Sequence, residues 1–336
     1  MLWPERPDNW RLGAKPAQKA FAQVAENIAR FEPVFVGVSS SQYSNARYLL
    51  NKNIRVVEIS YNDSWIRDIG PTCVVNNQGK VRGVKWDFNA WGGLKDGLYF
   101  PWDDDCLVSE KVLEIEGLDM YVSDLVLEGG SIHVDGEGTL ITTEECLLNP
   151  NRNPHFSKKQ IEDILINYLN VSKIIWVKRG VYLDETSGHI DNLCCFVKPG
   201  VIALTWTNDE NDPQYAISME ALCLLTNSTD AKGRKFKIHK ILQPEPQFIT
   251  KEESESLDYS PYTKHRCYGD RMPASYINFY IVNSAIILPV FRCKEDDLAL
   301  NTLKELFDNR EIIQIPSREI LLGGGNIHCI TQQIPK

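Results

Sequence analysis

The chain of 336 residues is 43% hydrophobic and 24% charged, which is an ordinary composition for a globular protein. Its formal net charge of −9 argues against a surface for nucleic acid or anionic membrane and favours cationic partners. No apolar run approaches the roughly 20 residues that span a bilayer, and no signal-peptide pattern is present. We therefore expect a cytoplasmic protein that binds neither nucleic acid nor a membrane.

Short apolar runs that lead into polar or glycine-rich loops recur along the chain. They lie at residues 60–70, 125–136, 181–192, 272–279 and 319–329. GGSIHV in the second run resembles GGNIHC in the last, and such self-similarity is typical of a radial or stacked repeat. We expect the last run to form a strand, because its glycines precede alternating apolar and polar residues.

Amphipathic segments lie between these runs. Residues 16–31, 157–169 and 296–307 place apolar side chains at helical spacing, and the second segment begins with a capping box, Ser157 with Gln160. Strands that alternate with helices indicate the α/β class. No linker divides the chain, so we expect one catalytic domain over residues 1–336.

Two further segments bear on function. The polar run 250–266 is expected to form a long loop of the kind that covers a site. The cysteines are odd in number and show no C-x-x-C spacing, which argues against a disulfide framework or a zinc ribbon. We expect nine reduced thiols, most of them small core residues: Cys73, Cys106, Cys146, Cys194, Cys195, Cys223, Cys267, Cys293 and Cys329.

Residues that can carry chemistry gather in the repeated loops. An ionised thiol is a nucleophile, and a histidine can serve as acid and base. Several carboxylates would repel one another unless they hold a cation, and a guanidinium offers them five N–H donors. The loop residues concerned are Asp63, Trp65, Arg67, Asp68, Glu128, Asp184, Glu185, His189, Asp191 and Cys329. If the loops converge on one mouth, these residues indicate cysteine chemistry on a guanidinium.

Two His-x-Asp pairs compete for the acid–base role. His189 and Asp191 follow an acidic loop, and on an extended strand both would face one ligand. His133 and Asp135 precede a tight turn, so we interpret this pair as scaffold. His328 is expected to point away from the cysteine that follows it and to be a core or supporting histidine.

Seven motifs, in order, make the chain resemble a known family. They are WPERPDNWR, SWIRDIGP, FNAWGG, LEGGSIHVDG, ETSGHIDN, ASYINFY and GGGNIHCITQQ. The chain is similar to the agmatine deiminases of the peptidylarginine-deiminase-like family, within the guanidine-modifying (pentein) superfamily. The resemblance implies a five-bladed, pseudo-symmetric α/β propeller of ββαβ repeats. Similar enzymes carry a further segment before the first motif, so we expect the first strand of the propeller to be incomplete.

The resemblance also implies roles for the catalytic residues. Cys329 would be the nucleophile, and His189 would be the proton donor and later the base that activates water. Asp68 and Asp191 would hold the guanidinium, with Glu128 contacting it or orienting the histidine. The Cys329 thiolate would attack the guanidinium carbon, ammonia would leave, and water would hydrolyse the S-alkylthiouronium. No metal or organic cofactor is implied.

The substrate channel is implied by the same motifs. Trp65, Trp91 and Glu185 would line it, with the glutamate nearest the distal ammonium of the substrate, and Gly324 would let the backbone approach closely. We interpret Arg67 as an ion-pair partner of nearby carboxylates.

Agmatine is the expected substrate, because its distal ammonium suits glutamate and aromatic faces whereas the carboxylate of free arginine would need an arginine. The product would be N-carbamoylputrescine, a step in putrescine and polyamine synthesis. The alternative enzyme is a peptidylarginine deiminase, which needs a mouth open to a peptide backbone. A non-catalytic propeller is the alternative of another class, and it would lack the cysteine, histidine and carboxylates. We expect a homo-oligomer, either a dimer or a tetramer.

Overall fold

Four three-stranded sheets repeat one topology in the computed structural model, which describes residues 1–336. In each sheet the first strand pairs antiparallel with the second, and the second pairs parallel with the third. The strands are β3 (Thr72–Val75), β4 (Val81–Asp87) and β5 (Asp119–Val126); β6 (Ile132–Val134), β7 (Thr139–Thr143) and β8 (Lys173–Val177); β9 (Cys194–Lys198), β10 (Val201–Trp206) and β11 (Lys237–Leu242); and β14 (Tyr280–Val282), β15 (Ala285–Val290) and β16 (Glu311–Pro316).

A fifth unit keeps only the parallel pair of this arrangement. β1 (Phe35–Val38) and β2 (Arg55–Glu58) pair in parallel, and Leu2 forms a parallel bridge with Gly37. A short antiparallel pair, β12 (Gln247–Phe248) and β13 (Arg271–Met272), lies between the third and fourth large sheets in the sequence. The protein is therefore a mixed α/β structure of several small sheets.

Each pair of parallel strands is joined through a helix, as a parallel connection requires. These helices are α2 (Tyr43–Leu49), α5 (Val108–Glu116), α7 (Lys158–Leu169), α8 (Pro213–Asn227) and α10 (Glu295–Leu306), and α1 (Lys15–Ile28) precedes β1. Shorter turns are α3 (Ile66–Ile69), α4 (Gly93–Asp96), α6 (Glu144–Leu147), α9 (Lys251–Glu255), α11 (Arg318–Leu321), η1 (Ser40–Gln42), η2 (Asp105–Leu107), η3 (Gly129–Ser131) and η4 (Ile190–Asn192). None of the helices combines the length and the apolar character needed to cross a membrane.

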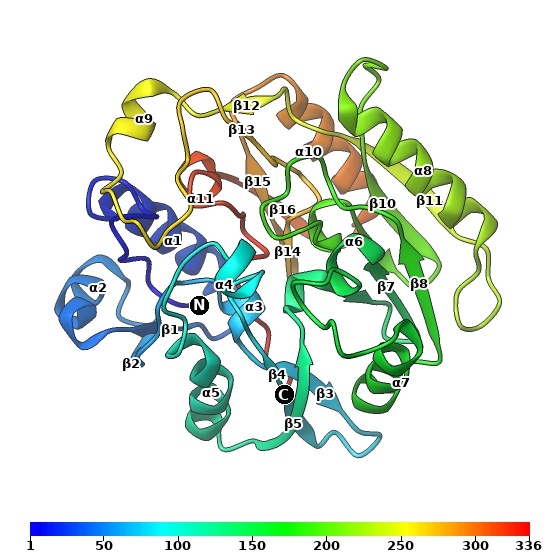
Figure 1. Ribbon diagram of the computed structural model, residues 1–336, viewed down its shortest axis with the longest axis horizontal. Coiled ribbons are helices and arrows are strands. Elements are labelled where there is room, and N and C mark those ends of the chain that lie inside the picture. Colours follow the sequence, from blue (N-terminus) through cyan, green and yellow to red (C-terminus); the bar gives the residue numbers. More distant parts are fainter.

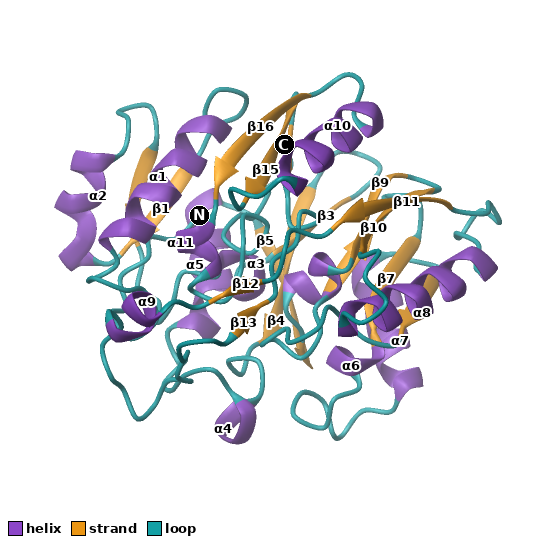
Figure 2. Ribbon diagram, turned by 90° about the horizontal axis from the view of Figure 1, so that it is seen from above, coloured by secondary structure: helices purple, strands orange, loops and turns teal.

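The sheets follow one another around the molecule in chain order, with α2, α5, α7 and α8 toward its outside (Figure 1). Figure 2 shows α1 and α2 beside β1 at one end, and α7 and α8 beside the sheets of β7 and β10 at the other. The buried apolar residues form four clusters, the largest with 36 residues. Each smaller cluster joins a helix to its own sheet and to the sheet that precedes it in the chain, so neighbouring units share their cores.

The three predicted helices correspond to α1, α7 and α10. Ser157 and Gln160 form the predicted capping box, because each side chain bonds to the backbone of the other residue. The helix α8 was not predicted, because its sequence PQYAISMEALCLLTN is apolar on most sides and shows no clear polar face. Asp212 caps this helix and Pro213 begins it, and that local signal could have located it.

The strand predicted at the chain's last run does not form. No strand follows β16, and residues 323–329 are turns and coil. The backbone there is bonded locally: the amide of Gly324 donates to Leu321, and the amide of Ile330 donates to Asn326. Gly324 has a φ of 105°, which a strand residue does not adopt. The segment is nevertheless fixed, because Ile330 and Thr331 are buried.

The long polar run at 250–266 contains one helix, α9, and continues as a loop. The loop is bonded to two distant parts of the chain. The amide of Asp258 donates to Pro7, and the amide of Lys264 donates to Leu98. The loop therefore lies against the N-terminal segment and the segment before α5.

Gly323 provides a test of how tightly the last run is packed. A Cβ at this position would overlap the six-membered ring of Trp10, which is only 1% exposed. We expect Gly323→Ala to lower the free energy of unfolding by about 1–3 kcal/mol, the usual cost of overpacking a core. The penalty, measured by denaturant unfolding, should shrink in a Trp10→Phe background, whose ring is smaller. An equal penalty in both backgrounds would place the strain elsewhere.

Candidate active site

Gly130 marks the point where loops far apart in the sequence meet. A Cβ placed there would lie 2.6 Å from Nδ1 of His189, 2.9 Å from Oδ1 of Asp68 and 3.0 Å from Oδ2 of Asp191. These distances are shorter than ordinary contacts, so only glycine fits at this position. The loops of three different sheets therefore converge, and all three side chains are buried.

Cys329 lies beside this group. Its Sγ is 3.8 Å from Oδ2 of Asp191 and 3.4 Å from Nδ2 of Asn278. Asn278 lies in the ASYINFY motif, but the sequence alone assigned it no contact. Burial raises the pKa of the Cys329 thiol well above its usual range, and the carboxylates of Asp191 and Asp68 raise it further. Without a cation to offset them, the burial and the two carboxylates favour the protonated thiol.

Asp191 is supported on one side and open on the other. Its Oδ2 lies 2.8 Å from Nδ1 of His328, whereas its Oδ1 is buried without a hydrogen-bond partner. His328 was expected to face away from the site, and this is wrong. The expectation assumed a strand, in which neighbouring side chains alternate, but the segment forms a turn. The expectation that His328 supports the site agrees with this contact. The open oxygen of Asp191 is available to a cationic ligand.

Asp68 is held by two donors from different loops. The amide of Gly130 donates to Oδ1 at 2.9 Å, and the indole Nε1 of Trp91 donates to Oδ2 at 2.9 Å. Burial raises the pKa of Asp68 to about 6, and the nearby Asp191 and Glu128 also raise it. Trp91 and Ala90 both have positive φ angles, so this loop is held in a conformation that non-glycine residues seldom adopt.

Glu128 and His189 form a buried acid–base pair. Nε2 of His189 lies 3.3 Å from Oε2 of Glu128, and the glutamate is 0% exposed. Burial alone would lower the pKa of His189, but Asp68, Cys146 and Glu128 outweigh it and raise the pKa well above its usual range. The histidine is therefore an imidazolium that can donate a proton. It precedes η4 rather than lying on a strand, and it still converges with Asp191.

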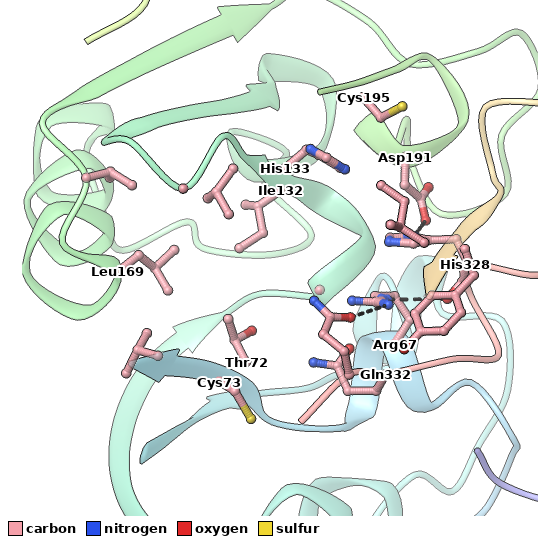
Figure 3. Close-up of a pocket in the computed structure, with 18 of the residues that line it drawn as sticks. Arg67, Thr72, Cys73, Ile132, His133, Leu169, Asp191, Cys195, His328 and Gln332 are labelled. Carbon is pink, nitrogen blue, oxygen red and sulfur yellow. Dashed lines mark hydrogen bonds and ion pairs between the residues drawn. The ribbon is translucent and has the colours of Figure 1, made fainter. Parts of the chain in front are cut away.

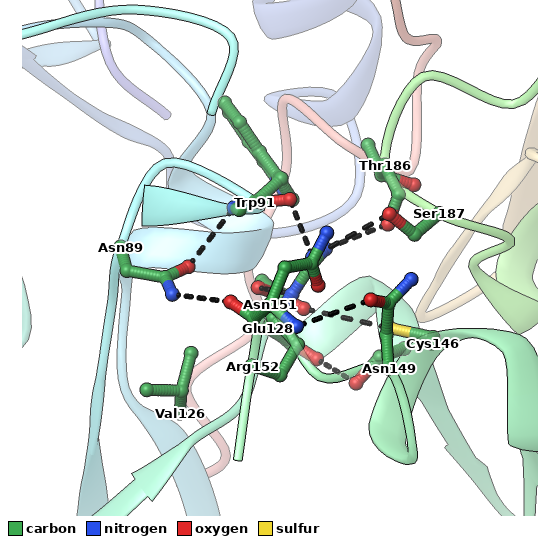
Figure 4. Close-up of polar contacts among 12 residues, drawn as sticks. Asn89, Trp91, Val126, Glu128, Cys146, Asn149, Asn151, Arg152, Thr186 and Ser187 are labelled. Carbon is green, nitrogen blue, oxygen red and sulfur yellow. Dashed lines mark hydrogen bonds and ion pairs between the residues drawn. The ribbon is translucent and has the colours of Figure 1, made fainter. Parts of the chain in front are cut away.

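Two residues near Glu128 were not anticipated. Cys146 is fully buried, and its Sγ lies 3.7 Å from Oε2 of Glu128. Arg152 donates from Nε to Oε1 of the same glutamate at 2.7 Å (Figure 4). Arg152 lies in the loop sequence NPNRNP, which offers no motif, so only the folded structure shows its contact with the site.

Trp65 is positioned by a second buried carboxylate. Asp63 accepts hydrogen bonds from the indoles of Trp65 (3.1 Å) and Trp10 (2.8 Å) and from the amide side chain of Asn9 (2.8 Å). The two indole rings lie 5.1 Å apart between centroids. A Cβ at Gly325 would meet the ring of Trp65 at 2.5 Å, so the indole packs on the glycine run that precedes the cysteine. Asp63 therefore anchors the indole of Trp65.

Glu185 is engaged by cations of the 250–266 loop. Arg266 donates to its Oε2 at 2.6 Å, and Nζ of Lys264 lies 3.8 Å from Oε1. Arg266 is also hydrogen-bonded to Asn9. Gly324 packs directly against this pair, since a Cβ there would lie 2.6 Å from Oε2 of Glu185 and would overlap Arg266. The loop thus contacts Glu185 and Gly324, and Arg266 is a residue that the sequence did not single out.

Arg67 does not pair with a carboxylate, contrary to expectation. Its Nε donates to the carbonyl of His328 at 3.3 Å, and its Nη2 donates to Oε1 of Gln333 at 2.9 Å. Its amide donates to the carbonyl of Cys329. Figure 3 shows Arg67, His328 and Gln332 side by side along a cavity of about 480 Å³ that Asp191 also borders. Arg67 therefore secures the backbone that carries the nucleophile candidate.

His133 and Asp135 lie outside this constellation. Nδ1 of His133 accepts from the amide of Phe196 at 3.3 Å, and burial lowers the pKa of His133 to about 3. Oδ1 of Asp135 accepts from the amides of Glu137 (2.7 Å) and Thr139 (2.9 Å) and so holds a turn. These contacts are those of scaffold residues.

Glu128, Cys146 and His189 place ligand-type atoms within 4.8 Å of one another, the spacing of a metal site. A cation among them would meet the guanidinium of Arg152, which already occupies one oxygen of Glu128, and the imidazolium of His189. The two positive charges, on Arg152 and His189, therefore oppose metal binding and favour proton transfer by His189.

Comparison with known proteins places this arrangement in a family. The chain matches the family model described as Porphyromonas-type peptidyl-arginine deiminase over residues 1–335. It is 61% identical to putative agmatine deiminase 1 of Listeria monocytogenes serotype 4b (strain F2365), covering 100% of this chain and 93% of that protein. It is 56% identical to the agmatine deiminase of Pseudomonas syringae pv. syringae (strain B728a), covering 100% of this chain and 92% of the relative.

The folds agree as well. A solved structure described as agmatine deiminase of Enterococcus faecalis catalyzing its reaction superimposes with a TM-score of 0.97 at 49% sequence identity. The match covers 100% of this chain and 92% of that one. The chain therefore belongs to the Porphyromonas-type peptidyl-arginine deiminase family.

Proposed function

We propose that the protein is an agmatine deiminase, which hydrolyses agmatine to N-carbamoylputrescine and ammonia. The observation that carries this proposal is the buried group formed by Cys329, His189 and two carboxylates, Asp68 and Asp191, of which the second has an oxygen open to a ligand. The two buried aspartates share one imidazolium, that of His189, and the negative charge left over suits a cationic substrate. The agmatine deiminases among the relatives support the choice of guanidine.

The first chemical step follows from the charges of the site. A guanidinium between Asp68 and Asp191 offsets the two negative charges that raise the pKa of Cys329, so substrate binding favours loss of the thiol proton to water and leaves the thiolate. The thiolate then attacks the guanidinium carbon. His189 is already an imidazolium, and it gives its proton to the departing ammonia.

The second step uses the same histidine in the opposite direction. Once His189 has lost its proton, it can accept one from water, which attacks the S-alkylthiouronium carbon and releases the ureido product. The proton taken from water restores the imidazolium for the next cycle, and the Glu128 carboxylate, which faces Nε2, stabilises it. The two carboxylates fix the planar group for in-line attack, which is a positioning effect.

The channel walls favour a slim cation over a peptide. Trp65 and Trp91 are 5% and 3% exposed, and Glu185 with Arg266 closes the side next to Gly324. Glu185 would meet the distal ammonium of agmatine with Oε1, where the half-exposed Lys264 lies 3.8 Å away and would have to give way. A peptidylarginine deiminase would need this side open.

Three wider features belong to the same proposal. The five ββαβ-like units form a five-bladed, pseudo-symmetric propeller, and residues 1–336 act as one catalytic domain. The protein works as a cytoplasmic homo-oligomer, a dimer or a tetramer, in putrescine synthesis. The catalytic steps above use only the residues of the chain.

The direct test is ammonia release from agmatine, free arginine and a blocked arginyl peptide, measured side by side with the same enzyme. We expect agmatine to be turned over well above the other two, because free arginine adds an α-carboxylate that Glu185 would repel and the blocked peptide has no free ammonium. Comparable turnover of the peptide would favour a peptidylarginine deiminase. Release from none of the three would favour a binding protein.

The pH profile tests the role of Asp68. A carboxylate must be ionised to hold a guanidinium, and the pKa of Asp68 is raised to about 6 in the free protein. We expect kcat/KM for agmatine to be high above pH 6 and to fall as the pH drops through that value, since kcat/KM reports the free enzyme. A profile that stays flat down to pH 4 would show that Asp68 does not bind the substrate as an anion.

The two His-x-Asp pairs predict opposite outcomes. His189→Ala should lower kcat/KM by the ~10²–10⁴-fold typical of losing a general acid–base group, with little change in thermal melting. His133→Ala should lower the melting temperature, because it leaves the amide of Phe196 without its partner at a cost of about 1–3 kcal/mol, while folded enzyme stays active.

The carboxylates give a matching contrast. Asp191→Asn should abolish activity, and Asp135→Asn should be mild because its Oδ1 can still accept both amides. The four variants are compared by kcat/KM and by thermal melting. An active His189→Ala protein, or a folded but inactive His133→Ala protein, would reverse the assignment.

A further inference from the structure

We propose that Arg152 is a positioning residue for deimination, which keeps Glu128 charged and holds two loops of the substrate channel in place. The proposal rests on the proposed function, and it goes beyond the residues that the family motifs point to. It is carried by the contacts of a single guanidinium that lies wholly inside the protein.

One carboxylate links the arginine to the acid–base histidine. Nε of Arg152 lies 2.7 Å from Oε1 of Glu128, and Nε2 of His189 lies 3.3 Å from Oε2. The side chains of Arg152 and Glu128 are both 0% exposed. No other arginine or lysine lies within 4 Å of this glutamate. Arg152 is therefore the basic side chain outside the catalytic group that can keep Glu128 ionised.

The balance of energies at Glu128 depends on that contact. Burial by itself would raise the pKa of Glu128, but Arg152, followed by His189, outweighs it and lowers the pKa to about 2. Without the arginine, burial would dominate and the carboxyl would take up a proton more readily. A neutral Glu128 would no longer attract the imidazolium that must protonate the leaving ammonia.

The other nitrogens of the guanidinium hold the channel. Nη1 donates to the carbonyl of Trp91, and Nη2 donates to the carbonyl of Thr186 at 2.7 Å (Figure 4). The indole of Trp91 in turn donates to Asp68, and Thr186 follows Glu185 in the chain. The planar guanidinium forms a fork of N–H groups in fixed directions and makes both contacts at once, whereas a lysine would supply only a point charge.

The charge and the fork can be separated by two substitutions. Arg152→Lys keeps a positive charge near Glu128 but cannot bond both carbonyls in the same geometry. Arg152→Gln removes the charge. The matched control is Arg271→Gln, which breaks an arginine–carboxylate pair with Asp212 away from the site. The double variant Arg152→Gln/Glu128→Gln removes both charges, so no lone buried carboxylate remains to unfold the protein.

The first readout needs no activity. Infrared spectra across pH compare Arg152→Gln with the double variant, and their difference isolates the protonated carboxyl of Glu128. We expect its pKa to rise by about two units or more in Arg152→Gln and to stay near its original value in Arg152→Lys. Wild-type protein that fails to act on agmatine would refute the proposed function, and this titration would still decide the charge role of Arg152.

The second readout is the split between kcat and KM for agmatine. Arg152→Gln should lower kcat by about 10²-fold, the lower end for an acid–base group. Arg152→Lys should mainly raise KM, by about tenfold, because the channel loops loosen while Glu128 stays charged. Arg271→Gln should lower only the melting temperature.

Two results would overturn the proposal. One is a folded Arg152→Gln protein whose Glu128 titrates as in the wild type. The other is a folded Arg152→Lys protein with unchanged KM, which would show that the fork does not hold the channel. If Arg152→Gln does not fold, Arg152→Lys decides: a raised KM with normal titration supports the proposal, and a protonated Glu128 contradicts it.

Discussion

The site depends on placing several carboxylates where water cannot stabilise their charge. Glu128, Asp68 and Asp191 are all at most 6% exposed, and an unpaired buried charge is costly. The three carboxylates have different partners. Glu128 pairs with Arg152. Asp68 accepts from two neutral donors, has a raised pKa and lies 3.9 Å from Nδ1 of the charged His189. Asp191 has a neutral histidine on one oxygen. The negative charge that no partner neutralises therefore lies on the two aspartates, and a guanidinium would bind there.

The same arrangement explains why the nucleophile can remain unreactive without substrate. The pKa of the Cys329 thiol is raised by burial and by the same aspartates that attract the cation. Binding and activation are therefore linked: the ligand that fills the site also removes the charges that hold the thiol proton. A neutral electrophile would not gain this advantage.

The sequence predicted the helices with strong amphipathic spacing, the α/β class, the family and the group of loop residues that converge at Gly130. These features depend on local pattern or on motifs. It did not predict α8, which lacks a polar face, or the turn at Cys329, where local hydrogen bonds outweigh the alternating pattern of a strand. The sequence also did not predict the partners Arg152, Arg266 and Asn278, because each acts through a contact with a segment 24 or more residues away in the sequence. The pairing of Arg67 was wrong for the same reason, since the nearby carboxylates in its loop point elsewhere.

Gly130 has a consequence for anyone who substitutes every position in turn and scores activity. A single methyl group there would press on His189, Asp68 and Asp191 at once. Such a scan would rank this glycine with the catalytic residues, although it contributes no functional group to the reaction. Its Ala variant should also resist rescue by added base or altered pH, because the defect is one of volume. Intolerance to substitution at this position reports how little free space separates the reacting groups.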